Sequence, residues 1–234
     1  MGKSTIARIG RKTLIEVHLH ASGASKSLYA NPPDWPEMLV WQQRLGPGDL
    51  FVDVGANAGV YALWTADLGA DVIAVEPSRR ACQWLRRNIE LNGLPITVIE
   101  AALTDFEGTV GFDSSGDAVG HIGGPEVVAA TTLDAVLGQR RAAGVKIDVE
   151  GFERLVLQGA TEALAEHRIE CIQLEWNQCS QLAFGEDRSP TAALLAEFGY
   201  RLHRPADDGR LYPIGNLAFG PDVFALPRLE NAPR

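Results

Sequence analysis

The chain of 234 residues carries 21 lysines and arginines against 30 aspartates and glutamates, a net charge of -9, and its length without a low-complexity linker fits a single domain. The acidic balance argues against a surface for duplex nucleic acid, which needs basic stripes to neutralise phosphates. No run approaches the ~18 apolar residues of a membrane span, and the basic N-terminus lacks the apolar segment of a secretory signal, so we expect a cytoplasmic protein without a membrane partner.

The elements predicted along the chain alternate between helices and strands. A helix at 36–45 begins at a proline and ends at the turn LGPGD, which leads into the first strand and a glycine turn. The alternation that follows predicts a parallel sheet with helical connections. After the glycine turn we expect a helix over about 59–68, a strand over 71–76, a helix over about 78–92, a strand over 96–101, a strand pair that includes GTVGFD, a helix from about Thr132, a strand that ends in VKIDVEG, a helix in FERLVLQGA, a strand over 170–177, a helix over 189–199 capped by Ser189, a strand pair in YRLHR and LYPI, and a last strand in DVFALPR.

The segment FVDVGANAGVYAL at 51–63 joins an apolar strand to a helix through a turn with two glycines. Gly55 and Gly59 let the backbone turn sharply and leave room for a ligand beside the free N–H groups at the helix start. A dinucleotide site wants G-x-G-x-x-G, whereas the pattern here is D-x-G-x-N-x-G, and Asp53 at the strand end would repel a pyrophosphate. This carboxylate suits a ligand with an ammonium and a sulfonium group, which favours S-adenosylmethionine.

The next strand, VIAVEPS, ends in Glu76. Its carboxylate can accept hydrogen bonds from both hydroxyls of a ribose, which indicates a nucleoside without saying which one. Asn57, at a non-glycine position of the preceding turn, is expected to tolerate an unusual backbone angle and to touch the same ligand.

The segment VKIDVEGFERLVLQGA at 145–160 breaks the rule that a central parallel strand is apolar on both faces. A period of two puts Lys146, Asp148 and Glu150 on one face at the carboxyl end of the strand. Buried charges need partners, so these groups must pair with one another, with a ligand or with a metal.

In these motifs the chain resembles the FkbM family of S-adenosylmethionine-dependent methyltransferases. The resemblance covers about Gly46 to Pro227 and rests on segments in the family's order: DVGANAG at 53–59, VEPS at 75–78, ALTDFEG at 102–108, TTLDAVL at 131–137 and KIDVEGFE at 146–153. It implies the class I methyltransferase fold, an α/β, doubly wound, mostly parallel seven-stranded sheet of order 3-2-1-4-5-7-6 with an antiparallel edge strand. Residues 46–234 then form the Rossmann-like domain, and residues 1–45, which carry no motif, are expected to pack on the site or cap it.

The resemblance also implies a cofactor site at the carboxyl ends of strands one and four, where the topology switches. Asp105, after the third strand, either reaches the adenine or only begins a turn. The residues expected to contact S-adenosylmethionine are Asp53, Gly55, Ala56, Asn57, Gly59, Tyr61, Glu76, Pro77, Ser78, Ala102 and Asp148.

Methyl transfer from a sulfonium requires that the protein hold the acceptor in line and exclude water. An alcohol acceptor also needs a base. The candidate catalytic residues are His121, Lys146, Asp148, Glu150 and Glu175. His121, in the glycine-rich loop 113–126, is the preferred base because a histidine titrates near neutral pH.

Each candidate also has a simpler interpretation. Asp148 can bind the ammonium group of the cofactor, and Lys146 can be an internal counter-ion for Asp148 or Glu150. Glu150 can pair with Lys146 or cap the turn. His121 can be a solvated loop residue, and Glu175, which ends a strand, can be a structural carboxylate.

Other reactive or aromatic residues fit structural roles. The cysteines and the remaining histidines lack a metal-ligand spacing, so we expect no metal and reduced thiols. Trp41, Trp64 and Trp84 sit on helical apolar faces that are typical of a core.

We therefore expect an O-methyltransferase that acts on a hydroxyl of a small-molecule natural product or a sugar, without nucleic acid as a partner; homo-oligomers stay open. Methylation of nitrogen or of a carboxyl group uses the same donor geometry and stays open too. Alternatives of another class are a nicotinamide-binding oxidoreductase, against which Asp53 and the missing third glycine weigh, and a non-catalytic module that only binds the cofactor.

Overall fold

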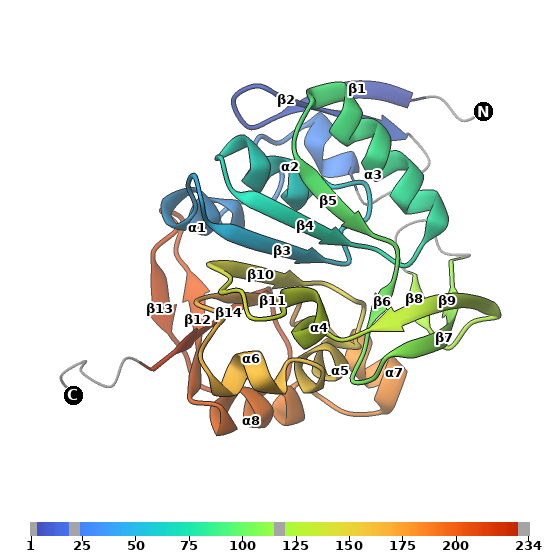
Figure 1. Ribbon diagram of the computed structural model, residues 1–234. Coiled ribbons are helices and arrows are strands. Elements are labelled where there is room, and N and C mark those ends of the chain that lie inside the picture. Colours follow the sequence, from blue (N-terminus) through green and yellow to red (C-terminus); the bar gives the residue numbers. More distant parts are fainter. Residues whose placement is uncertain (1–3, 19–23, 115–119, 229–234) are drawn as a thin grey trace.

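The computed structural model describes residues 4–18, 24–114 and 120–228. A central sheet of eight strands crosses the molecule (Figure 1). In spatial order its strands are β13 (Leu211–Pro213), β12 (Tyr200–Pro205), β14 (Val223–Pro227), β11 (Ile172–Leu174), β10 (Gly144–Ile147), β3 (Leu50–Val54), β4 (Asp71–Val75) and β5 (Ile96–Ile99).

The sheet has the predicted doubly wound topology. Strands β3, β4, β5, β10 and β11 run parallel to one another, and β14 lies antiparallel between β11 and β12. When the seven core strands are numbered along the chain, their order from β5 to β12 is 3-2-1-4-5-7-6, which confirms the prediction. The short β13 lies antiparallel beside β12 at the edge, so the sheet is one strand wider than predicted.

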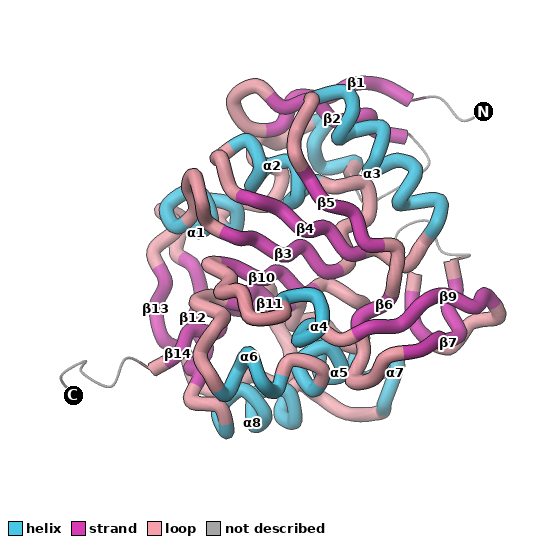
Figure 2. Tube along the Cα trace, in the orientation of Figure 1, coloured by secondary structure: helices cyan, strands magenta, loops and turns pink. Residues whose placement is uncertain are grey.

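Helices cover both faces of the sheet (Figure 2). Side chains alternate between the two faces along each strand, so that Phe51 packs with the layer of α1, α2 and α3, whereas Val52 and Val54 pack with the layer of α4, α5, α6 and α8. No helix in the described ranges is long and apolar enough to cross a membrane. The helices are η1 (Ser25–Leu28), α1 (Glu37–Arg44), α2 (Val60–Asp67), α3 (Arg79–Asn92), α4 (Leu133–Leu137), α5 (Glu153–Gln158), α6 (Thr161–Ala165), α7 (Cys179–Phe184) and α8 (Ser189–Glu197).

A second, smaller sheet stands beyond the carboxyl ends of β3, β4 and β5, on the right in Figure 1. It includes the predicted strand in GTVGFD, and part of the predicted loop 113–126, residues 115–119, lies outside the described ranges. Helix α4 follows it, with Thr132 Oγ1 accepting a hydrogen bond from Ala135 N at 3.1 Å. In spatial order the strands of this sheet are β6 (Ala102–Leu103), β9 (Glu126–Thr131), β7 (Gly108–Asp113) and β8 (His121–Ile122).

The N-terminal residues form a hairpin, β1 (Ser4–Ile9) with β2 (Thr13–His18), that packs on the helical layer. Ile9, Ile15 and Val17 are buried against Leu63 of α2. Asn88 Oδ1 of α3 accepts a hydrogen bond from the backbone of the hairpin. The hairpin therefore extends the core on the far side of α2 and α3 from the central sheet.

Helix α8 begins at Ser189 as predicted, but the predicted cap is wrong. Arg188 occupies the cap position, and no side chain accepts a capping hydrogen bond there. Ser189 N donates instead to Asp187 Oδ1 at 2.8 Å. The carbonyl of Arg188 accepts the first helical hydrogen bond, from Ala192 N, so the cap lies one residue before the predicted one.

Candidate active site

A cavity of about 240 Å³ opens at the carboxyl ends of β3, β4 and β10. The turns after these strands meet there with the small sheet and with the end of β11. Two residues named as possible cofactor contacts, Gly59 and Asp105, are not on its lining. The other predicted site residues lie on it: Asp53, Gly55, Ala56, Asn57, Tyr61, Glu76, Pro77, Ser78, Ala102, His121, Lys146, Asp148, Glu150 and Glu175.

The turn after β3 depends on its glycines. Gly55 has a φ of 80°, and a Cβ there would lie 1.9 Å from the carbonyl oxygen of Asp148, so only glycine lets the turns after β3 and β10 meet. Gly59 has a φ of 94°, and its Cβ would lie 2.5 Å from Leu85 Cδ1 of α3. Gly59 therefore permits the start of α2 but lies behind the cavity wall. Asn57 has a φ of 49°, the unusual backbone angle expected of it.

Lys146 lies in a polar row across the sheet, on the face covered by α1 and α2. It is in parallel register with Asp53 of β3 on one side and with Gln173 of β11 on the other. Its Nζ lies 2.6 Å from Asp148 Oδ2 and 4.7 Å from the centroid of the Tyr61 ring. Burial lowers the pKa of Lys146, but the carboxylates of Asp148 and Asp53 outweigh burial and raise the pKa above its ordinary value. Lys146 is therefore the charged partner of Asp148.

Asp53 is buried with one carboxylate oxygen unpaired. Its Oδ2 accepts a hydrogen bond from Ala62 N of α2 at 2.9 Å, whereas Oδ1 has no hydrogen-bond partner among the described residues. Burial raises the pKa of Asp53 to about 6, against the opposing charge of Lys146. An unpaired oxygen in a buried carboxylate costs free energy unless a ligand donates to it. Asp53 is thus prepared to receive a donor from the cavity.

Glu76 closes the next strand and lines the same cavity. Its Oε2 accepts from Asn57 N at 2.9 Å and its Oε1 from Ser78 N at 2.8 Å. Burial raises the pKa of Glu76 to about 7. Each of the two oxygens keeps a further lone pair, so Glu76 can also accept two hydrogen bonds from a ligand.

Glu150 departs from the predicted pattern. Strand β10 ends at Ile147, and Glu150 has a φ of 53°, so it lies in the turn. The predicted alternation is wrong beyond Asp148 because the chain leaves the strand there. Glu150 Oε2 accepts a hydrogen bond from Cys179 Sγ at 3.2 Å rather than pairing with Lys146, and burial raises the pKa of Glu150.

Glu175 follows β11 at the same edge of the sheet. Burial raises its pKa to about 9, with a further contribution from the carboxylates of Asp148 and Glu150. Its Oε2 is buried without a hydrogen-bond partner in the described part of the chain. With this pKa Glu175 would carry a proton at neutral pH, which favours a hydrogen-bond donor over a base.

Glu150, Glu175 and Cys179 place three atoms that could ligate a metal within 4.8 Å of one another. Burial raises the pKa of all three groups, that of Glu175 to about 9 and that of Cys179 to about 12. Metal ligands must be deprotonated. A cation could therefore bind this cluster only by displacing protons from it.

His121 lies on β8 of the small sheet and is exposed. The pairing of Asp113 with His121 joins β7 to β8, and Phe112 and Ile122 line the cavity together with His121. The small sheet thus forms one wall of the cavity and brings His121 to the same space as Glu175.

One wall of the cavity, lined by Trp84, is not predicted from the sequence. Trp84 of α3 is expected in the core, and Trp41 and Trp64 are indeed buried, but Trp84 is half-buried and lines the cavity. Its ring stacks on His18 with centroids 4.7 Å apart and lies 4.6 Å from Arg80 Cζ. The arginines around it in RRACQWLRR are the available signal that this part of α3 is not fully covered.

Several solved structures of methyltransferases are similar to this one. The chain aligns with the T. thermophilus 16S rRNA N2 G1207 methyltransferase, in complex with AdoMet and guanosine, at 18% identity over 97% of this chain and 50% of that one, with a TM-score of 0.52. A TehB-like SAM-dependent methyltransferase from Corynebacterium glutamicum gives 11% identity over 87% of this chain and 93% of that one, with a TM-score of 0.51. The Pyrococcus abyssi tRNA (uracil-54, C5)-methyltransferase, in complex with S-adenosyl-L-homocysteine, gives 12% identity over 95% of this chain and 43% of that one, with a TM-score of 0.51. Identities this low establish the fold alone, and this chain spans half or less of the two RNA methyltransferases.

No curated protein matches the chain. A family model, the Methyltransferase FkbM domain, matches residues 53–202. The match includes the turns after β3, β4 and β10, which build the cavity. The chain therefore belongs to the FkbM family of methyltransferases.

Proposed function

We propose that this protein transfers a methyl group from S-adenosylmethionine to a hydroxyl of a small uncharged molecule, such as a sugar or another natural product. The observation that carries the proposal is the presence of two buried carboxylates, Asp53 and Glu76, at adjacent strand ends on one cavity. Neither uses its full hydrogen-bonding capacity within the described residues. The cofactor is S-adenosylmethionine, in keeping with the family.

The lining of the cavity fits this cofactor group by group. Asp53 Oδ1, which has no partner among the described residues, would accept from the ammonium group of the methionine part, and Asp148 lies on the same lining. Glu76 would accept from the two ribose hydroxyls. Pro77 and Ala102 supply apolar surface for the adenine.

The bound cofactor supplies a methyl group that its sulfonium has already activated. The residues of the protein position the acceptor, exclude water and take up the proton that the hydroxyl loses, and such a base typically contributes ~10²–10⁴-fold. His121, Asp148 and Glu150 are the candidates for this base on the lining. Glu175 would instead donate a hydrogen bond to the acceptor, since its pKa of about 9 keeps it protonated.

The charge of the lining supports an uncharged acceptor. RNA phosphates and a carboxylate acceptor would be repelled by this lining. An amine is the second candidate, because the same carboxyls attract an ammonium group. Asp34, which also lines the cavity, belongs to the N-terminal segment. This supports the proposal that residues 1–45 help to cap the site. Even without the protonated Glu175, carboxyl groups outnumber cations on the lining: Asp34, Asp53, Glu76, Asp148 and Glu150 against Arg80 and Lys146.

Two measurements test this function. Calorimetry should show binding of S-adenosylhomocysteine and no binding of NAD. Methyl-labelled cofactor is then offered with panels of sugars, phenols, amines, carboxylic acids and ribosomal RNA, and we expect label in the hydroxyl compounds. Label in RNA or in carboxylic acids would replace the proposed acceptor. Binding of S-adenosylhomocysteine without transfer to any panel would support a non-catalytic module.

A further inference from the structure

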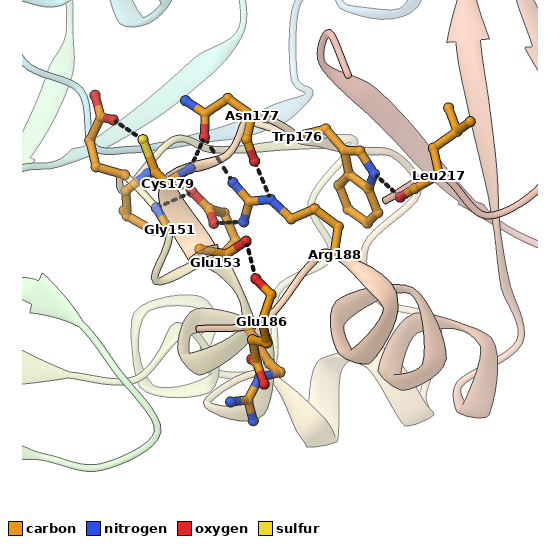
Figure 3. Close-up of polar contacts among 12 residues, drawn as sticks. Gly151, Glu153, Trp176, Asn177, Cys179, Glu186, Arg188 and Leu217 are labelled. Carbon is orange, nitrogen blue, oxygen red and sulfur yellow. Dashed lines mark hydrogen bonds and ion pairs between the residues drawn. The ribbon is translucent and has the colours of Figure 1, made fainter. Parts of the chain in front are cut away.

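Glu153 of α5 and Arg188, which precedes α8, form an ion pair in which both side chains are fully buried. Glu153 Oε2 accepts a hydrogen bond from Arg188 Nη1. Figure 3 shows the guanidinium group of Arg188 between Glu153 and Asn177. Buried charges are stable only when all their hydrogen-bonding groups are satisfied. The other partners of this pair therefore show what it holds in place.

The second oxygen of Glu153 holds the turn after β10. Glu153 Oε1 accepts from Val149 N at 3.3 Å and from Gly151 N at 3.1 Å. These two amides flank Glu150, whose own backbone is in the left-handed region with a φ of 53°. Glu153 thus fixes a strained turn that presents Glu150 to the cavity.

The other side of Arg188 holds the loop after β11. Arg188 Nε donates to Asn177 O at 3.1 Å, and Nη2 donates to Asn177 Oδ1 at 3.2 Å. Asn177 Oδ1 also accepts from Cys179 N at 2.9 Å. Cys179 Sγ in turn donates to Glu150 Oε2 at 3.2 Å, which closes a ring of contacts between the two loops. Glu175 lies at the start of the loop that this ring holds.

We propose that Arg188 is a positioning residue, which acts through Glu153 and Asn177 to fix Glu150 and Glu175 on the cavity. The kinetic part of this proposal rests on the methyltransferase function proposed above. The guanidinium group suits the role because its planar fork donates in fixed directions to several acceptors at once, which an ammonium group does not.

Cofactor binding should not depend on Arg188. Asp53 is held by the backbone N–H of Ala62, and Glu76 by the backbone N–H groups of Asn57 and Ser78. These contacts lie at the ends of β3 and β4 and in the first turn of α2. A loss of Arg188 should therefore lower turnover and leave the affinity for the cofactor unchanged.

The test compares Arg188→Lys with a control variant at another buried arginine, Arg168→Met. Arg168 is also a buried arginine, 5% exposed, with its Nε 2.6 Å from Glu166 Oε2 and its Nη1 donating to Gly138 O at 2.6 Å. It precedes β11, at the amino edge of the sheet, and is not on the cavity lining. Asn177→Ala is a milder second variant, because it removes the side-chain contacts and leaves the buried ion pair.

Amide hydrogen exchange without acceptor gives the first measurement, at a temperature where all variants are folded by circular dichroism. In Arg188→Lys the amides of Val149, Gly151 and Cys179 should exchange about tenfold faster than in the wild type, while the rest of the chain does not change. In Arg168→Met these amides should exchange at the wild-type rate. Unchanged rates in Arg188→Lys and Asn177→Ala, or a uniform increase along the chain, would overturn the proposal.

Steady-state kinetics give the second measurement. In Arg188→Lys, kcat should fall about 10- to 100-fold, because small displacements of catalytic groups have effects of this size. The dissociation constant of S-adenosylhomocysteine should stay within about threefold of the wild-type value. An equal loss of kcat in Arg168→Met would show a merely structural role. A wild-type protein that methylates no acceptor would overturn the proposed function, and hydrogen exchange would still decide the role of Arg188.

Discussion

Lys146 and Asp148 form an ion pair in which one partner is buried and the other is partly exposed. The distance from Nζ to Oδ2 is 2.6 Å, and 6% of the Lys146 side chain is exposed, compared with 36% of the Asp148 side chain. Asp53, which lies beside Lys146 in the register of β3 and β10, is 1% exposed. Lys146 therefore balances the charge of the buried carboxylate of Asp53 and orients the partly exposed carboxylate of Asp148.

Lys146→Met should lower the free energy of unfolding by about 2 kcal/mol. This is less than the ~3–5 kcal/mol of a fully buried pair, because water can still solvate Asp148. Urea denaturation measures the loss. Arg86→Met is the control, since it removes an exposed pair with Glu100 at 3.0 Å and should cost less than ~1 kcal/mol. Equal losses in the two variants would show that Lys146 does not balance a buried charge.

The ligand-free protein should lose stability as the pH rises from about 4 to about 7. Burial raises the pKa of Asp53 to about 6 and that of Glu76 to about 7, whereas unfolded Asp and Glu titrate near ~3.9 and ~4.3. Between these values the folded state binds more protons than the unfolded state. The stability that these protons contribute is therefore fully present below the unfolded pKa values and is lost as the pH rises through the folded pKa values.

Thermal unfolding at a series of pH values measures this loss. The double variant Asp53→Asn, Glu76→Gln should show a shallower decline than the wild type. Part of the slope should remain, because burial also raises the pKa of Asp222 to about 7 and that of Glu175 to about 9. A melting temperature that rises over this range would mean that the two carboxylates are already ionised in the folded protein.

The sheet and the cofactor side of the cavity can be predicted from local sequence. Apolar runs that end in Asp53, Glu76 and Asp148 mark strand ends at one edge of a parallel sheet, and the confirmed strand order brings these ends together. Gly55 can be predicted as well, because a left-handed turn beside a strand end favours glycine.

The rest depends on contacts between distant parts of the chain. Glu153 and Arg188 are 35 residues apart, and no spacing in the sequence marks one as the partner of the other. The period of two fails at Glu150 because the strand has already ended. Trp84 is misplaced because an aromatic residue on an amphipathic helix can face a core or a cavity, and only the tertiary structure decides between them.

Gly55→Ala should abolish cofactor binding and destabilise the fold. The new Cβ would lie 1.9 Å from the carbonyl oxygen of Asp148, and this contact is with backbone that cannot rotate away. Gly93→Ala is the matched control, because Gly93 has a φ of 62° and a Cβ added there would meet nothing within 4 Å; the backbone angle alone should cost about 1 kcal/mol. Calorimetry with S-adenosylhomocysteine and urea denaturation measure the two effects. Equal losses would show that the turns after β3 and β10 can separate freely.

The variant Glu175→Gln tests whether Glu175 acts as a neutral hydrogen-bond donor or as a base. Because the pKa of Glu175 is raised to about 9, glutamine resembles the wild-type side chain at pH 7. Turnover should therefore stay within about threefold of the wild type at pH 7 and diverge only above about pH 9.

His121→Ala should instead lower turnover ~10²-fold at saturating cofactor, with unchanged affinity for S-adenosylhomocysteine. Single-turnover kinetics of both variants distinguish the roles. A large loss in Glu175→Gln at pH 7, together with normal methyl transfer in His121→Ala, would assign the base to Glu175.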